Sequence, residues 1–91
     1  MQLELDQVEI WPDNRIGIRF KKVIVEADGT VHNLKEYHRI SADPGADLER
    51  TFEFEGKTYG FPDKAKNIAS VIWTADIVEK FQADALAALE D

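Results

Sequence analysis

The spacing of the apolar residues changes once along this chain, from every second residue to every third or fourth. Ile16, Ile18 and Phe20 alternate with glycine and arginine, which is typical of a β-strand with one buried face. From residue 65 onwards the apolar residues instead recur at i, i+3, i+4 and i+7, as on an amphipathic helix. This order predicts an α+β fold, in which an antiparallel β-meander is followed by two C-terminal α-helices packed on one face of the sheet.

Turn residues divide the first part of the chain into three expected strands within residues 7–41. The segment Pro12-Asp13-Asn14 separates the first strand from the second, since proline fixes φ and Asp or Asn tolerates tight bends. Asp28-Gly29 separates the second strand from the third, because both residues accept a positive φ.

The alternation of the second strand slips by one position after Phe20, because the next apolar residue is Val23. A β-bulge near Lys21 would put the apolar residues on both sides of it on one face.

A second, short hairpin is expected over residues 51–61, where aromatic residues flank the turn Glu55-Gly56. It is either an extra pair of strands on the sheet or a projecting β-arm. We expect it to project and to stand outside the minimal core, so that replacing residues 51–60 with a short Gly/Ser loop would leave a folded domain. Its apolar face would then be the interface with a partner chain, through four aromatic residues: Phe52, Phe54, Tyr59 and Phe61.

The dipeptide Trp73-Thr74 marks a corner between two helices. Thr74 suits the N-cap of the second helix, and Trp73 before it can pack on Val78 as a hydrophobic staple. The second helix is expected over about residues 75–89, and its apolar face comprises Ile77, Val78, Phe81, Ala85, Leu86 and Leu89.

Length and charge limit the function. A chain of 91 residues forms one domain, residues 1–91, with one modest core. Its formal net charge of −7 repels nucleic-acid phosphate and anionic membranes, so we expect neither as a partner. The first six residues contain acids and neither a basic start nor an apolar stretch, so we expect no signal peptide there.

A local basic cluster lies on the second strand and consists of Arg15, Arg19, Lys21 and Lys22. It is either a weak nucleic-acid patch or, as we expect, the solvent face of a strand whose bases pair with acidic neighbours.

The chain shows no pattern that indicates catalysis or a cofactor. It has no cysteine, so disulfides and thiolate chemistry are excluded. Its two histidines, His32 and His38, lie on one expected strand roughly 20 Å apart, too far to share a metal ion. No Gly-x-Ser-x-Gly elbow and no phosphate-binding glycine loop occurs in the sequence. We therefore expect a protein without enzymatic activity, cofactor or metal.

The order of several short motifs resembles a group of small tailed-bacteriophage proteins, mostly uncharacterised and encoded beside tail or tail-fibre genes. The motifs are Tyr37-His38-Arg39 at a strand end, a loop that runs from Asp43 to Asp47, the corner Trp73-Thr74, and a closing Phe81-Gln82-Ala83. The resemblance covers nearly the whole chain, but residues 50–61 look like an insertion relative to shorter members. The resemblance supplies no catalytic residue. For Arg39 we expect hydrogen bonds to carboxylates or carbonyls around the loop of Asp43 and Asp47.

What the resemblance implies is a non-enzymatic structural or accessory component of a phage tail or tail-fibre region. Such a protein would act through contacts with other tail or tail-fibre proteins, or with copies of itself around a symmetric axis. It would reside in the tail of the virion, or in the host cytoplasm during assembly. Two alternatives are a transient assembly factor for a tail or fibre protein and a small acidic inhibitor of a host protein.

Overall fold

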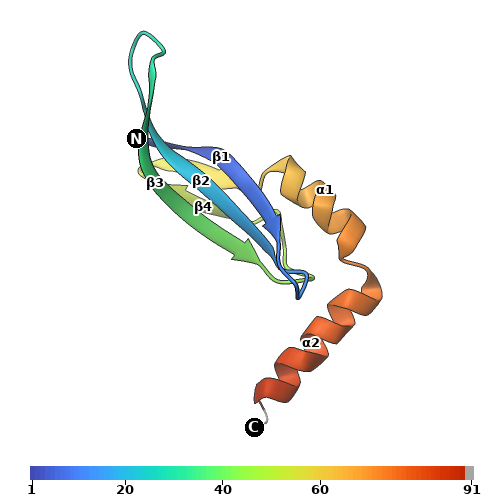
Figure 1. Ribbon diagram of the computed structural model, residues 1–91. Helices are drawn as coiled ribbons and strands as arrows, with labels where there is room; N and C mark the ends of the chain where they lie inside the picture. Colours follow the sequence, from blue (N-terminus) through green and yellow to red (C-terminus); the bar gives the residue numbers. More distant parts are fainter. Residues whose placement is uncertain (90–91) are drawn as a thin grey trace.

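A three-stranded antiparallel meander forms the first part of the computed structural model, which describes residues 1–89. Its strands are β1 (Gln2–Ile10), β2 (Ile16–Val25) and β3 (Val31–Ala42), in the order β1-β2-β3 (Figure 1). Both expected turns are present. At the second turn Gly29 has a φ of 90°, and the backbone N–H of Thr30 donates a hydrogen bond of 2.9 Å to Oδ1 of Asp28. This hydrogen bond, with a second one from the Thr30 side chain, lowers the pKa of Asp28.

The irregularity expected near Lys21 exists, but it belongs to β3. The pairing of β2 with β3 jumps from Lys21↔Tyr37 to Val23↔Asn33, so a step of two residues on β2 matches a step of four on β3. Lys35, within the longer step, has a left-handed φ of 58°. The pairing of β2 with β1 runs without a break across the same region, so the alternation of β2 is unchanged. Val23 is therefore buried on the face opposite Phe20 and lies outside the main core cluster, which corrects the prediction of one shared face.

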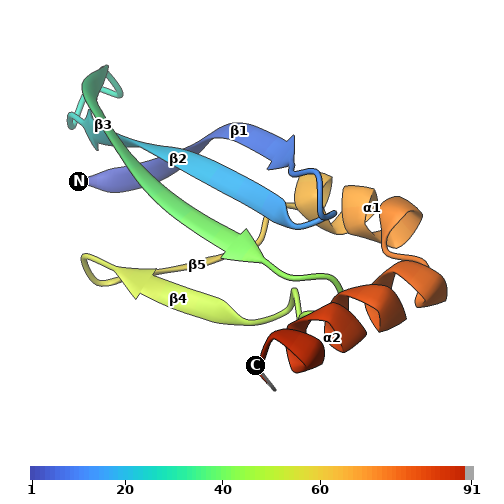
Figure 2. The same ribbon diagram turned by 60° about the horizontal axis from the view of Figure 1, so that its bottom comes forward.

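The second hairpin consists of β4 (Thr51–Phe54) and β5 (Lys57–Gly60), which form a separate two-stranded sheet. It faces the inner side of the meander, and Figure 2 shows it below the three longer strands. The core lies between the two sheets and the first helix, and its buried residues are Leu3, Ile16, Ile18, Phe20, Ala42, Phe61, Ala65 and Ala69. Phe52, Phe54 and Tyr59 pack against this core. The prediction that the hairpin projects outside the minimal core is therefore wrong.

The two C-terminal helices, α1 (Asp63–Ile72) and α2 (Ala75–Leu89), begin and end close to the predicted positions. The α+β fold class is thus confirmed. The first helix packs on the core through Ala65 and Ala69. All residues of α2 are described, and none of them is buried. Helix α2 instead extends away from α1 across one end of the meander (Figures 1 and 2).

Across residues 1–89, no helix combines the length and the apolar character needed to cross a membrane.

Candidate interaction surface

Four aromatic side chains and His38 form one contiguous cluster between the meander and the hairpin. The ring of His38 stacks on Phe52, with centroids 5.4 Å apart and an angle of 23° between the planes, and lies 5.6 Å from Phe54. Phe52 in turn contacts Phe20 at 5.9 Å and stacks on Tyr59 at 5.8 Å. Offset-stacked and tilted rings at these distances stabilise a core beyond their buried area. His38 is therefore a packing residue that joins β3 to the hairpin.

The hairpin is also tied to the meander by polar contacts. The hydroxyl oxygen of Tyr59 accepts a hydrogen bond of 3.0 Å from the backbone N–H of Leu3, which satisfies a donor on the free edge of β1. Lys57 Nζ donates to Oε1 of Gln2 at 2.6 Å. The interface role predicted for the hairpin residues stays a prediction, but Phe61 is buried and the other three rings already have partners within their own chain.

The hydrogen bond predicted for Arg39 at the end of β3 is made by Arg50 instead. Arg39 is exposed, and its side chain forms no hydrogen bond or ion pair with any residue of the described part of the chain. Arg50 instead donates from Nη2 to the carbonyl oxygen of Ser41 at 3.0 Å, and its guanidinium lies 5.2 Å from the ring centroid of Phe61. The prediction for Arg39 failed because it assigned the contact by closeness in sequence, whereas Arg50 reaches the end of β3 from the start of the hairpin.

The loop after β3 is closed by its own groups. The backbone N–H of Ala46 donates to the carbonyl oxygen of Asp43 at 2.9 Å, and the N–H of Glu49 donates to Oδ1 of Asp47 at the same distance. Asp43 and Asp47 therefore shape the loop without help from Arg39.

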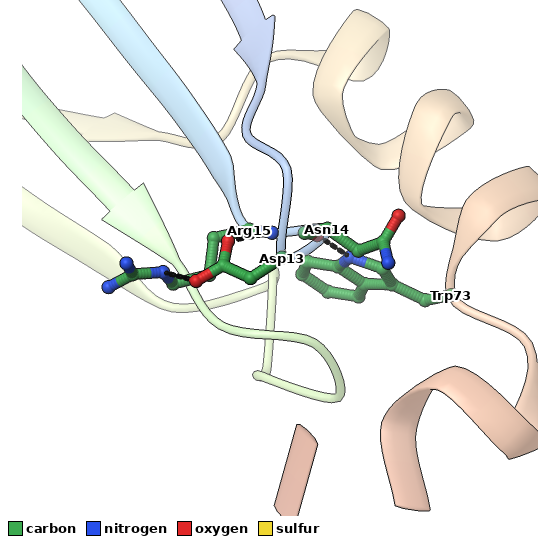
Figure 3. Close-up of polar contacts among 4 residues, drawn as sticks. All are labelled: Asp13, Asn14, Arg15 and Trp73. Carbon is green, nitrogen blue, oxygen red and sulfur yellow. Dashed lines mark hydrogen bonds and ion pairs between the residues drawn. The ribbon is translucent and has the colours of Figure 1, made fainter. Parts of the chain in front are cut away.

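The corner between α1 and α2 is held by a hydrogen bond to a turn near the N-terminus. Trp73 Nε1 donates to the carbonyl oxygen of Asn14, in the turn between β1 and β2, at 2.7 Å (Figure 3). In that turn, Asp13 accepts a hydrogen bond from Nε of Arg15. Thr74 caps α2 as expected, although its Oγ1 lies 3.4 Å from the N–H of Ile77, which is long for a hydrogen bond.

Acidic side chains neutralise the basic cluster, in which Arg15 precedes β2 and the other three bases lie on it, as the sequence predicts. Each of its four bases has an acidic partner within 4 Å: Asp13 for Arg15, Asp6 for Arg19, Glu4 for Lys21 and Glu36 for Lys22. The strand therefore presents paired charges and no free basic patch.

The surface that the sequence reasoning missed is a groove between α2 and the loop after β3. Its volume is about 470 Å³, and it is lined by Asp43, Pro44, Gly45, Ala46, Phe81, Gln82, Ala85, Leu86 and Leu89. The loop and the helix meet at Gly45, where a Cβ atom would lie 2.9 Å from Cγ1 of Val78. Leu86 and Leu89 remain 60% and 83% exposed. A sequence signal existed, because residues 83–89 contain one charged residue, too few for a helix that is exposed on most sides.

Within residues 1–89, no three or more His, Cys, Asp or Glu side chains lie where they could hold a metal ion. A second, smaller hollow of about 170 Å³ on the outer face of the sheet is lined by Trp11, Arg39 and six other residues. Its tryptophan ring packs on Gly17 and carries Arg15 5.0 Å from its centroid, so the ring is not free to stack on a ligand.

Comparison of the chain with protein-family models, with curated proteins and with solved structures finds no match.

Proposed function

We propose that this protein is a non-enzymatic structural component of a tailed-phage tail or tail-fibre region, which binds its partner through α2 and the loop after β3. The resemblance described above supplies the setting. The surface between α2 and the loop after β3 differs from the aromatic hairpin that the sequence favours.

The observation that carries the proposal is that the apolar stripe of α2 is only partly covered within its own chain. Ile77, Val78 and Phe81 are half-buried, whereas the C-terminal part of the stripe is exposed. Helices in proteins owe most of their stability to packing of such a stripe, because local propensity alone is marginal for a helix of this length. Leu86 and Leu89 stand exposed on consecutive turns, beside the groove. A partner that covers them would supply the packing that the rest of the chain does not.

The test is mass spectrometry of purified particles of the phage that encodes this chain. We expect the protein in the particles at a fixed ratio to a tail protein. We also expect Leu86→Ser to reduce its incorporation strongly, since the substitution removes an exposed apolar contact without touching the core. Val71→Ser is the matched control, because Val71 is 75% exposed on α1 and lies outside the groove.

Two results would contradict the proposal. If the protein is absent from particles but bound to a tail or fibre protein in infected cells, it is a transient assembly factor. If it binds a host protein and no phage protein, it is an inhibitor or regulator of the host.

A further inference from the structure

We propose that the groove between α2 and the loop after β3 receives an amphipathic helix whose apolar anchors are flanked by lysine or arginine. This inference rests on the proposed function and names the chemistry of the partner.

The shape of the groove suits apolar side chains. One wall is the face of α2 that carries Phe81, Ala85, Leu86 and Leu89, and the other is the Pro44-Gly45-Ala46 segment. Pro44 is buried and Gly45 has a φ of 89°, so the loop wall has a defined backbone. Anchors spaced at i, i+4 and i+7 on a partner helix are the usual occupants of a groove with one helical wall.

The charge around the groove favours a partner that carries basic residues beside its apolar anchors. Asp43 lines the groove, and no lysine or arginine of residues 1–89 does. Lys80, the one base of α2, lies with the residues of the neighbouring cleft beside Pro12 and is paired with Asp84 at 3.4 Å. Lys66 of α1 is paired with Glu49 at 3.2 Å. The groove therefore has an apolar floor and an acidic edge that none of its own lining residues neutralises. A partner with lysine or arginine beside its apolar anchors would supply the missing positive charge.

The same charges argue against a second copy of the chain. Each copy has a formal charge of −7, and a symmetric pair that used this groove would bring two Asp43 edges and two acidic helices together. Like charges that face each other across an interface oppose association. A basic amphipathic helix is instead attracted by the same negative charges.

The experiment uses the full chain and two fluorescein-labelled amphipathic peptides. The peptides share leucine anchors at i, i+4 and i+7 and differ only in carrying lysine or glutamate at the flanking positions. Binding is measured by fluorescence anisotropy at about 0.01 M and about 0.15 M salt. We expect the lysine peptide to bind at least about tenfold more tightly than the glutamate peptide at low salt, with a smaller difference at high salt. Leu86→Ser should abolish binding of the lysine peptide, Asp43→Asn should weaken it severalfold, and Val71→Ser should leave it unchanged.

Three outcomes would overturn the inference. Equal binding of both peptides would show that charge does not select the partner. Absence of binding by either peptide would show that the groove does not receive a helix of this kind. A doubled mass in sedimentation equilibrium that Leu86→Ser abolishes would make a second copy the occupant. Incorporation into particles, which tests the proposed function, is measured independently of these three results, so the two proposals can fail separately.

Discussion

The indole N–H of Trp73 donates a hydrogen bond of 2.7 Å to the backbone carbonyl of Asn14, 59 residues earlier in the chain. Asn14 has a left-handed φ of 69°, and its own N–H donates to the carbonyl oxygen of Trp11 at 2.9 Å. The first turn of the meander and the corner between the two helices are therefore one structural unit. This contact fixes the residue that caps the C-terminus of α1 and immediately precedes Thr74, the cap of α2.

We expect Trp73→Phe to lower the free energy of unfolding by about 1 kcal/mol, because it removes the hydrogen bond and keeps an aromatic ring. Trp73→Ala should cost about 3 kcal/mol, since it also removes the packing of a partly buried ring. Urea denaturation followed by circular dichroism measures both. The control is Trp11→Phe, whose indole N–H has no hydrogen-bond partner among residues 1–89. Equal losses for Trp73→Phe and Trp11→Phe would show that the bond to Asn14 contributes nothing.

Replacement of residues 51–60 by a short Gly/Ser linker should unfold the domain. The replacement removes the rings of Phe52, Phe54 and Tyr59 from the core, and loss of one large buried ring alone costs about 3 kcal/mol. Total stabilities are about 5–15 kcal/mol. Thermal melts followed by circular dichroism give the readout. Glu55→Gly changes the turn of the hairpin, at a φ of 47°, and removes an exposed ion pair with the N-terminal amine, so it should melt close to the parent chain. A cooperative melt of the replacement variant near the parent temperature would place the hairpin outside the core after all.

Gly45→Ala should destabilise the chain more than Gly29→Ala, although the two glycines have nearly equal φ angles of 89° and 90°. Both substitutions incur the cost of a left-handed alanine, about 1 kcal/mol. Only at position 45 does the new Cβ also meet Val78, at 2.9 Å, while nothing lies within 4 Å of it at position 29. We expect a further loss of about 1 kcal/mol or more for this overpacking. Hydrogen exchange of the α2 amides measures the local part of the effect, and identical exchange in the two variants would mean that the loop does not hold the helix.

The chain should bind duplex DNA no better than other acidic proteins do. Its basic strand carries four ion pairs, and the net charge of −7 repels phosphate at longer range. Fluorescence anisotropy with a labelled duplex at about 0.15 M salt is the measurement. Tight binding with a steep dependence on salt would show that these bases leave their acidic partners for phosphate.

The local structure of this protein follows from its sequence. Alternation in β2, the Asp28-Gly29 turn, the helical repeat after residue 65 and the cap at Thr74 are set by residues within a few positions of one another. Turn and helix signals of this kind depend on φ preferences and side-chain direction, which each residue brings with it. The same holds for the charge of the chain and for the absence of cysteine.

The tertiary structure decided which apolar faces meet. The rings of Phe52 and Phe54 give the same sequence pattern whether the hairpin projects or closes over the core, and only tertiary contacts such as those with His38 and Phe20 distinguish the two. Arg50 took the contact expected of Arg39 because the chain returns to the end of β3 after the loop. The exposure of Leu86 depends on where α2 lies relative to the rest of the chain. Contacts between residues far apart in sequence depend on the sum of many weak packing energies, and no local pattern encodes that sum.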